Sequence, residues 1–320
     1  MSLNILVTGS SGYLGSSICE FLSKTNHNVT GVDIKSPEIE YKNLNYVVSS
    51  LESFINTDKS LLKSFDLIIH SASVLPYKGK RNELVDTNIK TTKLLVDNIV
   101  NNESLFFVYI SSSGVYGNPK DLPIDKGTEL NPLDLYAKTK ISSENYIQEN
   151  INEKRFSIVR PRTILGENRG GIFSIFFSLI KRNIPIPIPN KGNQKIQFVD
   201  VHDLTKLIIF LGENKINGIW PGAAPNPMPL KEHLNYLGSV LNKKIITFNV
   251  NPKLFLLIGN ILIFLKITNF TKWHFGAFPN SFYFDYKWKP SGFDYEYDCN
   301  DSFMKCASST FLNIKKDNDE

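Results

Sequence analysis

Cysteine is scarce in this chain, and its placement excludes the structures that depend on cysteine clusters. The 3 cysteines, Cys19, Cys299 and Cys306, form neither an even set nor a Cys-x-x-Cys pair. A disulfide framework and a cysteine-based metal site are therefore not expected. The sequence suits a reducing cytoplasm, where we expect the protein to work, and it predicts no metal centre.

Concentrated positive charge is also missing. The formal net charge is +5 at pH 7, but basic and acidic residues are interspersed, and basic runs are as short as Lys78 to Arg81 and Lys315-Lys316. Because a nucleic-acid-binding surface needs clustered basic residues, we expect no nucleic-acid partner.

Long apolar runs are absent as well. A largely apolar segment between Lys253 and Lys266 is interrupted by Gly259-Asn260 and falls short of the ~20 residues that cross a bilayer. We expect a buried helix there; the alternative is an exposed apolar face for a lipid-like substrate or the membrane surface, a contact that we do not favour. The N-terminus enters an apolar strand at Leu3–Val7 without signal-peptide features, so we expect no export.

The first motif that is present combines a strand, a glycine loop and a helix. With 42% hydrophobic and 12% aromatic residues, 320 residues supply the core of one large domain or two packed ones. The apolar run Ile5–Val7 leads into a loop with Gly9, Gly12 and Gly15, and a helical pattern follows. These glycines suit a tight turn, close approach of the backbone to a pyrophosphate, and packing of helix on strand. The motif predicts a dinucleotide site.

The second strand, Asn28–Asp33, ends in an acid where dinucleotide folds place the carboxylate that binds the adenosine ribose. Asp33 favours NAD over NADP, because it would repel a 2′-phosphate and no arginine stands beside it to receive one. The alternative is that Asp33 serves only as a turn residue.

The chemistry is predicted at Tyr136 and Lys140, which share one face of a helix because they are four residues apart. A phenol is a poor base at neutral pH, but a neighbouring ammonium favours the phenolate. Upstream, the buried strand Phe106–Ile110 runs into Ser111–Gly117, which brings a hydroxyl to the carboxyl end of a strand.

Two polar residues between these motifs have open roles. His70 ends a strand at Asp66–Ser73, and since it stands alone we expect a hydrogen-bonded wall of a cofactor site and no metal ligand. Asn88 lies in an amphipathic helix over Leu84–Val100, where it either braces the active site or belongs to a solvated face.

Together, these motifs resemble the extended short-chain dehydrogenase/reductase superfamily, in its NAD-dependent epimerase/dehydratase branch. The matching motifs cover about two thirds of the chain and are Thr8-Gly-x-x-Gly-x-x-Gly15, Asp33, His70-Ser-Ala-Ser73, Asp86-Thr-Asn88, Ser111-Ser-Ser-Gly-Val-Tyr-Gly117, Tyr136-x-x-x-Lys140, Arg160-Pro161 and Phe198-Val-Asp-Val-His-Asp203.

The resemblance implies an α/β fold, with a Rossmann-type doubly wound parallel sheet and a smaller C-terminal α/β substrate domain. The NAD-binding domain would span 1–165, with return segments near 195–222, and the substrate domain mainly 166–320. It also implies a homodimer, in which the helices that carry Asn88 and Tyr136 form a four-helix bundle with their symmetry mates.

Site residues follow from the same resemblance. The catalytic set would be Ser112, Tyr136 and Lys140, with Ser113 as the alternative hydroxyl. The cofactor contacts would be Gly9, Ser11, Gly12, Tyr13, Leu14, Gly15, Asp33, Ser50, Leu51, Ser71, Ala72, Ser73, Asn88, Tyr136, Lys140, Arg160 and Pro161. The substrate contacts would be Ser113, Thr163 and Lys195.

Three departures from the family pattern bear on function. Ser113 and Gly114 stand where dehydratases carry acids, which disfavours dehydration. Thr163 replaces an asparagine and Ile196 a diphosphate-binding arginine that nucleotide-sugar enzymes usually carry, although Lys195 is adjacent. Ser50 replaces an aspartate that contacts adenine.

The second half predicts a helix over Gly171–Ile180, an extended lid or wall at Pro185–Pro189 because prolines forbid a helix, and a frayed polar tail over Leu312–Glu320.

The function we predict is an NAD-dependent epimerase of a nucleotide-linked hexose, similar to UDP-hexose 4-epimerases, acting by transient oxidation of a secondary hydroxyl. The alternatives are an NAD-dependent dehydrogenase of a hydrophobic alcohol of hydroxysteroid or flavonol type, and a non-catalytic dinucleotide sensor.

Overall fold

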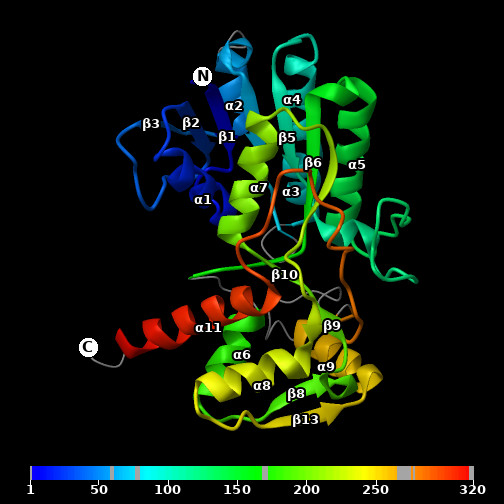
Figure 1. Cartoon of the computed structure of the whole chain (residues 1–320). Helices are drawn as coiled ribbons and strands as arrows, with labels where there is room; N and C mark the ends of the chain where they lie inside the picture. Colours follow the sequence, from blue (N-terminus) through cyan, green and yellow to red (C-terminus); the bar gives the residue numbers. More distant parts are fainter. Residues whose placement is uncertain are drawn as a thin grey trace.

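The protein is described by a computed structural model that covers residues 2–57, 61–75, 80–167, 172–264, 275–276 and 278–316. Its centre is a parallel seven-stranded sheet (Figure 1). In spatial order the strands are β11 (Gly218–Gly222), β6 (Phe156–Pro161), β5 (Phe106–Ile110), β4 (Leu67–His70), β1 (Asn4–Thr8), β2 (Asn28–Asp33) and β3 (Leu44–Val48).

The strand order reverses direction between β1 and β4, where Thr8 pairs with His70. In open α/β sheets, ligands bind beside the carboxyl ends of the strands at such a point. The expected doubly wound parallel sheet is confirmed. The glycine loop follows β1, so this fold brings it to the reversal.

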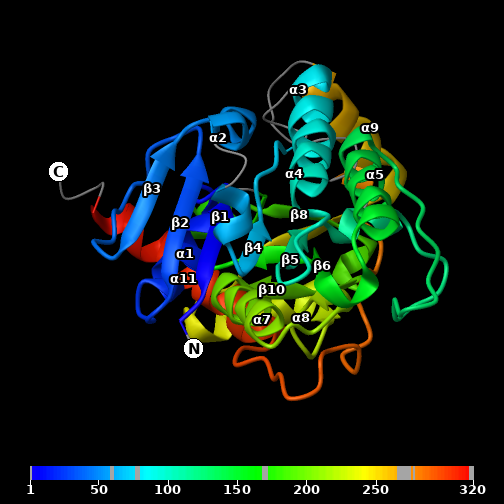
Figure 2. The same cartoon turned by 90° about the horizontal axis from the view of Figure 1, so that it is seen from above.

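Helices cover both faces of the sheet, as Figure 2 shows from above. One face packs against α1 (Tyr13–Leu22) and α7 (Val201–Glu213). The other packs against α2 (Leu51–Thr57), α4 (Thr91–Ile99) and α5 (Leu135–Asn150). Strands covered on both faces are apolar throughout, which explains the continuous apolar runs of β4 and β5.

Short turns complete this half of the molecule. A 3-10 turn at Leu61–Ser64 precedes β4, and others lie at Ser113–Tyr116 and Glu153–Arg155. The helix expected over Leu84–Val100 is in three pieces: α3 (Arg81–Val85), a π-helical turn (Asp86–Lys90) and α4.

A smaller group of elements, which we call the small lobe, lies below the carboxyl edge of the sheet in Figure 1. It contains α6 (Ile172–Lys181), β8 (Ile186–Pro189), a 3-10 turn (Asn190–Gly192), β9 (Lys195–Ile196), β12 (Met228–Pro229), α8 (Leu230–Val240), β13 (Thr247–Val250) and α9 (Pro252–Phe264). An aromatic core that includes Phe173, Phe177, Phe198 and Phe303 joins it to α11 (Cys299–Lys316).

Two connections tie the small lobe to the sheet. The strands β7 (Thr163–Leu165) and β10 (Phe198–Asp200) pair in parallel just beyond β6. Within the stretch expected to return, β11 pairs with β6 at the sheet edge. The predicted domain boundary at 165 stays a prediction.

In the second half, the structure agrees with two of the predictions made from the sequence and differs from two others. The helix expected at 171–180 is α6, and the segment with Pro185–Pro189 is extended, because β8 pairs with β13. The prediction of a frayed tail is wrong as far as Lys316, because α11 continues to that residue. Residues 317–320 lie outside the described ones.

The expectation of a buried helix between Lys253 and Lys266 is also wrong. The helix α9 forms, but of its residues only Gly259 is buried. Residues 265–266 lie outside the described ones. Among the described residues, no helix has the length and apolar character to cross a membrane.

Candidate active site

The glycine loop lies where β1 ends and α1 begins, and two of its glycines are required by packing. Gly9 has φ +71°, and a Cβ on it would lie 2.7 Å from the backbone of Ala72. A Cβ on Gly15 would lie 2.0 Å from the carbonyl oxygen of Gly9. Any side chain at these positions would displace the backbone, so the loop stays open at the N-terminus of α1, where phosphates are bound.

Asp33 is attached to this loop. Its carboxylate accepts hydrogen bonds from the backbone N–H groups of Ser11 and Lys35, each at 3.0 Å. The side chain is half-buried at the end of β2. Asp33 therefore does serve as a turn residue. The same bonds hold its carboxylate beside the glycine loop, which is where a contact with the adenosine ribose would need it.

His70 is enclosed at the reversal point. Its ring nitrogens lie 2.7 Å from Oγ1 of Thr8 and 2.9 Å from Oγ1 of Thr92. Burial lowers the pKa of His70 to about 3, and the charge of Lys140 lowers it further, so the ring is neutral. The described residues contain no group of three acidic, cysteine or histidine side chains that would hold a metal. The expected role as a hydrogen-bonded wall agrees with these contacts.

Asn88 braces the segment after β4. Its Oδ1 accepts from Ser73 Oγ at 3.1 Å and from the N–H of Val74 at 2.8 Å. Its Nδ2 donates to the carbonyl of Val74 and to Thr139 Oγ1, both at 3.1 Å. Of the two roles left open for it, the structure favours the brace. It links α5 to the loop in which Ser71, Ala72 and Ser73 lie.

Tyr136 and Lys140 occupy the beginning of α5. Asp134 starts this helix by accepting from the N–H of Ala137 at 2.8 Å. Lys140 is buried and donates to the carbonyl of Ile110 at 2.8 Å. Its Nζ lies 5.8 Å from the centre of the Tyr136 ring. Burial lowers the pKa of Lys140 to about 7, and the charge of Glu144 opposes this shift.

Three serines follow β5, and their environments differ. Ser112 is half-buried, and its Oγ accepts from the N–H of Gly114 at 3.1 Å, which leaves its O–H free to donate. Ser111 and Ser113 are buried, and Ser111 donates to Glu144. Of these three side chains, only that of Ser112 is not buried, and its catalytic role stays a prediction.

The sequence did not predict a buried ion pair between α5 and β6. Arg160 donates to Glu144 from Nε at 3.0 Å and from Nη2 at 2.5 Å, and its Nη1 donates to the hydroxyl of Tyr116 at 2.6 Å. The pair ties α5 to β6. Glu144 follows Lys140 by one helical turn, which is a detectable signal, but nothing in the sequence joins it to Arg160.

The remaining candidates are spread over the strand ends and the small lobe. Ser50 accepts from the N–H of Ser53 at 3.1 Å and so starts α2, where Leu51 is buried. Pro161 ends β6. Thr163 is half-buried on β7, whereas Lys195 is exposed on β9 with its Nζ 5.5 Å from the Tyr283 ring. Their contacts with cofactor and substrate stay predictions.

Arg162 is a further residue that sequence reasoning missed. It is 8% exposed, and its guanidinium lies 4.1 Å from the centre of the Phe282 ring. Burial lowers the pKa of Arg162 to about 10. Its Nε has no hydrogen-bond partner among the described residues. Arg162 lies between β6 and β7, one residue before Thr163.

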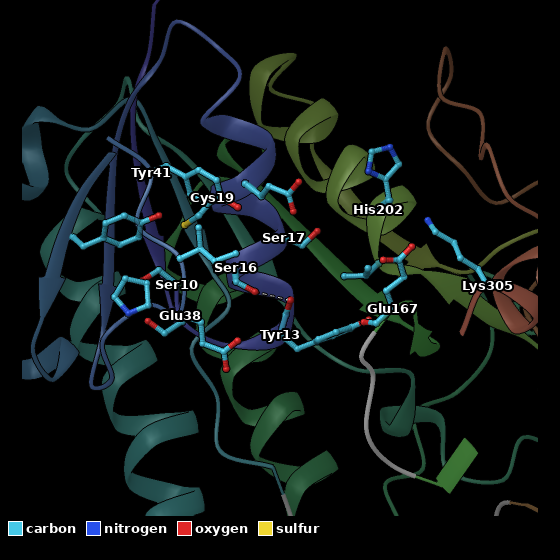
Figure 3. A pocket seen from close by; sticks show the side chains of 16 residues that line it. Ser10, Tyr13, Ser16, Ser17, Cys19, Glu38, Tyr41, Glu167, His202 and Lys305 are labelled. Carbon is cyan, nitrogen blue, oxygen red and sulfur yellow. Dashed lines mark hydrogen bonds between the residues drawn. The ribbon is translucent and has the colours of Figure 1, made fainter. Parts of the chain in front are cut away.

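A cavity of about 570 Å³ is lined by the glycine loop and the first turns of α1 (Figure 3). Tyr13, Ser16 and Ser17 of α1 face it, with His202 and Lys305 opposite. It contains neither Tyr136 nor Lys140. Ser112 instead follows β5, and Tyr136 and Lys140 lie at the beginning of α5. Their catalytic roles stay predictions.

Comparisons with known proteins agree with this geometry. The model of the NAD dependent epimerase/dehydratase family matches residues 5–221. A putative UDP-glucose 4-epimerase of Methanocaldococcus jannaschii is 29% identical over 239 residues, which cover 68% of this chain and 77% of that protein. An uncharacterized protein, y4nG of Sinorhizobium fredii, is 32% identical over 206 residues; these cover 64% of this chain and 52% of the relative, so the chain matches about half of its length.

A solved structure is similar over its whole length. The UDP-N-acetylglucosamine 4-epimerase from Methanobrevibacter ruminantium M1, in complex with UDP-N-acetylmuramic acid, has a TM-score of 0.76. It is 20% identical, and the match covers 98% of this chain and 99% of that chain. At this identity the likeness shows the fold.

Proposed function

The chain belongs to the NAD dependent epimerase/dehydratase family, and we propose that it is an NAD-dependent epimerase of a nucleotide-linked hexose, acting at the 4-hydroxyl. The observation that carries the proposal is the Lys140 ammonium buried against the carbonyl of Ile110, one helical turn from Tyr136. The named epimerases among the similar proteins support it.

The residues present fit the cofactor. Gly9 and Gly15 keep side chains away from the N-terminus of α1, where a pyrophosphate would be held. Asp33 would accept hydrogen bonds from the adenosine ribose and repel a 2′-phosphate. Ser50 already accepts from the N–H of Ser53, and it would meet the adenine in place of an aspartate.

The reaction needs a proton to move while the carbon is oxidised and then reduced. NAD, when bound, supplies reversible hydride transfer. Tyr136 takes the proton of the sugar hydroxyl and returns it to the oxygen after the ketone has presented its other face. Ser112 donates to that oxygen. Lys140 stabilises the phenolate of Tyr136 that is present before the proton is taken and again after it is returned.

Dehydration is the family reaction that the site supports least. It requires an acid and a base beside the catalytic hydroxyl, but Ser113 and Gly114 occupy those positions. Glu144 is the nearby carboxylate, and it is taken by Ser111 and Arg160.

For the substrate, we propose that Thr163 and Lys195 face the nucleotide-sugar end. Ile196 is buried, so the usual diphosphate arginine has no equivalent there. The exposed ammonium of Lys195 is adjacent and would pair with a diphosphate as a point charge.

A mass spectrum of the nucleotides released from the purified, denatured protein tests the cofactor part of the proposal. An epimerase regenerates its cofactor in place, so we expect NAD at near one equivalent without any addition. The rival, a dehydrogenase of a hydrophobic alcohol, must exchange its cofactor, and protein free of NAD whose turnover requires added NAD would favour it. A sensor would hold NAD and turn over neither substrate class.

We also propose a homodimer through α4 and α5, which lie side by side on one face of the sheet (Figure 2). The cytoplasm is the compartment that we propose, supported by three buried free thiols.

A further inference from the structure

The helix α9 is apolar on all sides but packed on only one. A Cβ on Gly259 would lie 2.3 Å from the ring of Phe275, so the helix meets the small lobe at this glycine. Beside it, the Phe255 ring lies 5.5 Å from that of Phe275 and 5.8 Å from that of Phe278, measured between centroids. A helix that is apolar all round is normally enclosed by protein or lipid.

The opposite side carries an exposed row of large apolar side chains. Leu254, Leu257, Ile258, Ile261 and Phe264 are 45% to 85% exposed, and we call them the α9 stripe. Their spacing of three or four residues puts them on one face of the helix. They point away from Gly259, so the packed and exposed sides are distinct.

Exposed apolar side chains continue into the strand before α9. Ile246 and Phe248 are 49% and 50% exposed, and Phe248 lies on β13. Figure 1 shows α9 in the small lobe, above β13, which it follows in the chain. A row of exposed large apolar side chains such as the α9 stripe marks an interaction surface.

The charges that precede the stripe in the sequence favour an anionic partner. From Leu230 to Phe264 the charged residues are Lys231, Lys243, Lys244, Lys253 and Glu232. Lys253 and Lys244 are exposed, and Lys253 stands directly before the stripe. A second copy docked by symmetry would bring these lysines together, whereas an anionic surface would pair with them.

We propose that this face docks on the surface of an anionic lipid bilayer. The α9 stripe would lie in the interface plane, about 5–10 Å into the boundary of headgroups and acyl chains. Lys253 would extend its apolar stem along the helix and place its ammonium among the headgroups. The proposal does not depend on the reaction that the active site performs.

Flotation with lipid vesicles tests it. The purified protein should float with vesicles of equal parts phosphatidylcholine and phosphatidylglycerol and much less with phosphatidylcholine alone. Leu257→Glu combined with Ile261→Glu removes two apolar contacts, and we expect the partition coefficient to fall at least about tenfold. Tyr286→Glu is the control, because Tyr286 is also an exposed apolar side chain, at 60%, but lies outside α9. Its segment is held to the seven-stranded sheet by Trp288, which donates to the carbonyl of Ile219 on β11.

The outcomes separate the partners. Absence of flotation, or equal flotation of the double variant, overturns the proposal, and so does a dimer that the double variant converts to monomer without any lipid binding. Equal thermal midpoints exclude misfolding. If the double variant does not fold, Lys244→Glu with Lys253→Glu should abolish the preference for anionic vesicles while leaving the stripe intact.

Discussion

At the scale of single residues, the proposed proton transfer depends on one buried ammonium. Burial brings the pKa of Lys140 to about 7, whereas the carboxylate of Glu144 and the carbonyl of Ile110 favour the ammonium. Tyr136, half-buried one turn earlier, is the group whose protonation this charge controls.

Replacing Tyr136 by phenylalanine removes only the phenolic oxygen. We expect turnover to fall by about two to four orders of magnitude, the usual share of a general acid or base, while the fold and NAD binding persist. Steady-state kinetics and NAD titration measure both. Tyr146→Phe, on the same helix, is the control. Retention of more than a few per cent of the activity would move the proton-transfer role to another group.

The second prediction concerns pH and Glu144. Burial lowers the pKa of Lys140, and Glu144 opposes this, so Glu144→Gln should lower that pKa further. The ammonium is then lost at a lower pH, and the alkaline limb of kcat/KM should move to lower pH. Glutamine keeps one accepting oxygen towards Ser111 and Arg160, but its NH2 group cannot accept, so one of the acceptors is lost.

Profiles of kcat/KM against pH for the wild type, Glu144→Gln and Glu149→Gln give the comparison. Glu149 is exposed on the same helix, so its variant should follow the wild type. An unchanged limb in Glu144→Gln, with an unchanged thermal midpoint, would limit Glu144 to its ion pair with Arg160.

At the scale of elements, a π-helical turn joins α3 and α4 and carries Asn88. The side chain of Asn88 makes four hydrogen bonds, three of them to the segment at Ser73 and Val74. A turn of this kind often marks a functional position in a helix. Here it turns an amide towards the loop that follows β4.

We expect Asn88→Ala to lower the free energy of unfolding by about 1–3 kcal/mol for each buried group that loses its partner. Chemical denaturation measures the change. Asn98→Ala is the matched control, because among the described residues the Asn98 side chain bonds within α4, to the carbonyl of Leu94. Similar losses in the two variants would contradict the brace.

Sequence patterns predicted the elements whose signals are local. The glycine loop, β2 with Asp33 and the start of α5 each depend on neighbours within a few residues, and all are where the patterns indicated. The Glu144–Arg160 pair joins a helix to a strand, so no local pattern contains it. The exposure of α9 was only the alternative to a buried helix, because a helix apolar on all sides does not reveal which side is covered.

At the scale of the whole molecule, two surfaces compete to be the interface between copies. The resemblance places it on α4 and α5, whereas exposed apolar area lies on α9. The described part of α4 and α5 carries no exposed large apolar side chain. Its surface includes the contact of Lys93 with the Tyr146 ring, at 4.6 Å.

Light scattering at micromolar concentration should give a dimer. Because we assign the dimer to α4 and α5, Leu257→Glu with Ile261→Glu should leave its mass unchanged. A monomeric wild type would remove the four-helix bundle from the account, and a monomeric double variant would move the interface to α9.

The most direct test of the central claim follows sugar stereochemistry and cofactor in one reaction. The purified protein is incubated with UDP-glucose, UDP-galactose or their N-acetyl and uronate forms, without added NAD. NMR follows the 4-hydroxyl configuration, and absorbance follows NADH. We predict interconversion of the 4-epimers without net NADH, because hydride returns to the same sugar. Stoichiometric NADH release that depends on added NAD would contradict the claim and identify a dehydrogenase.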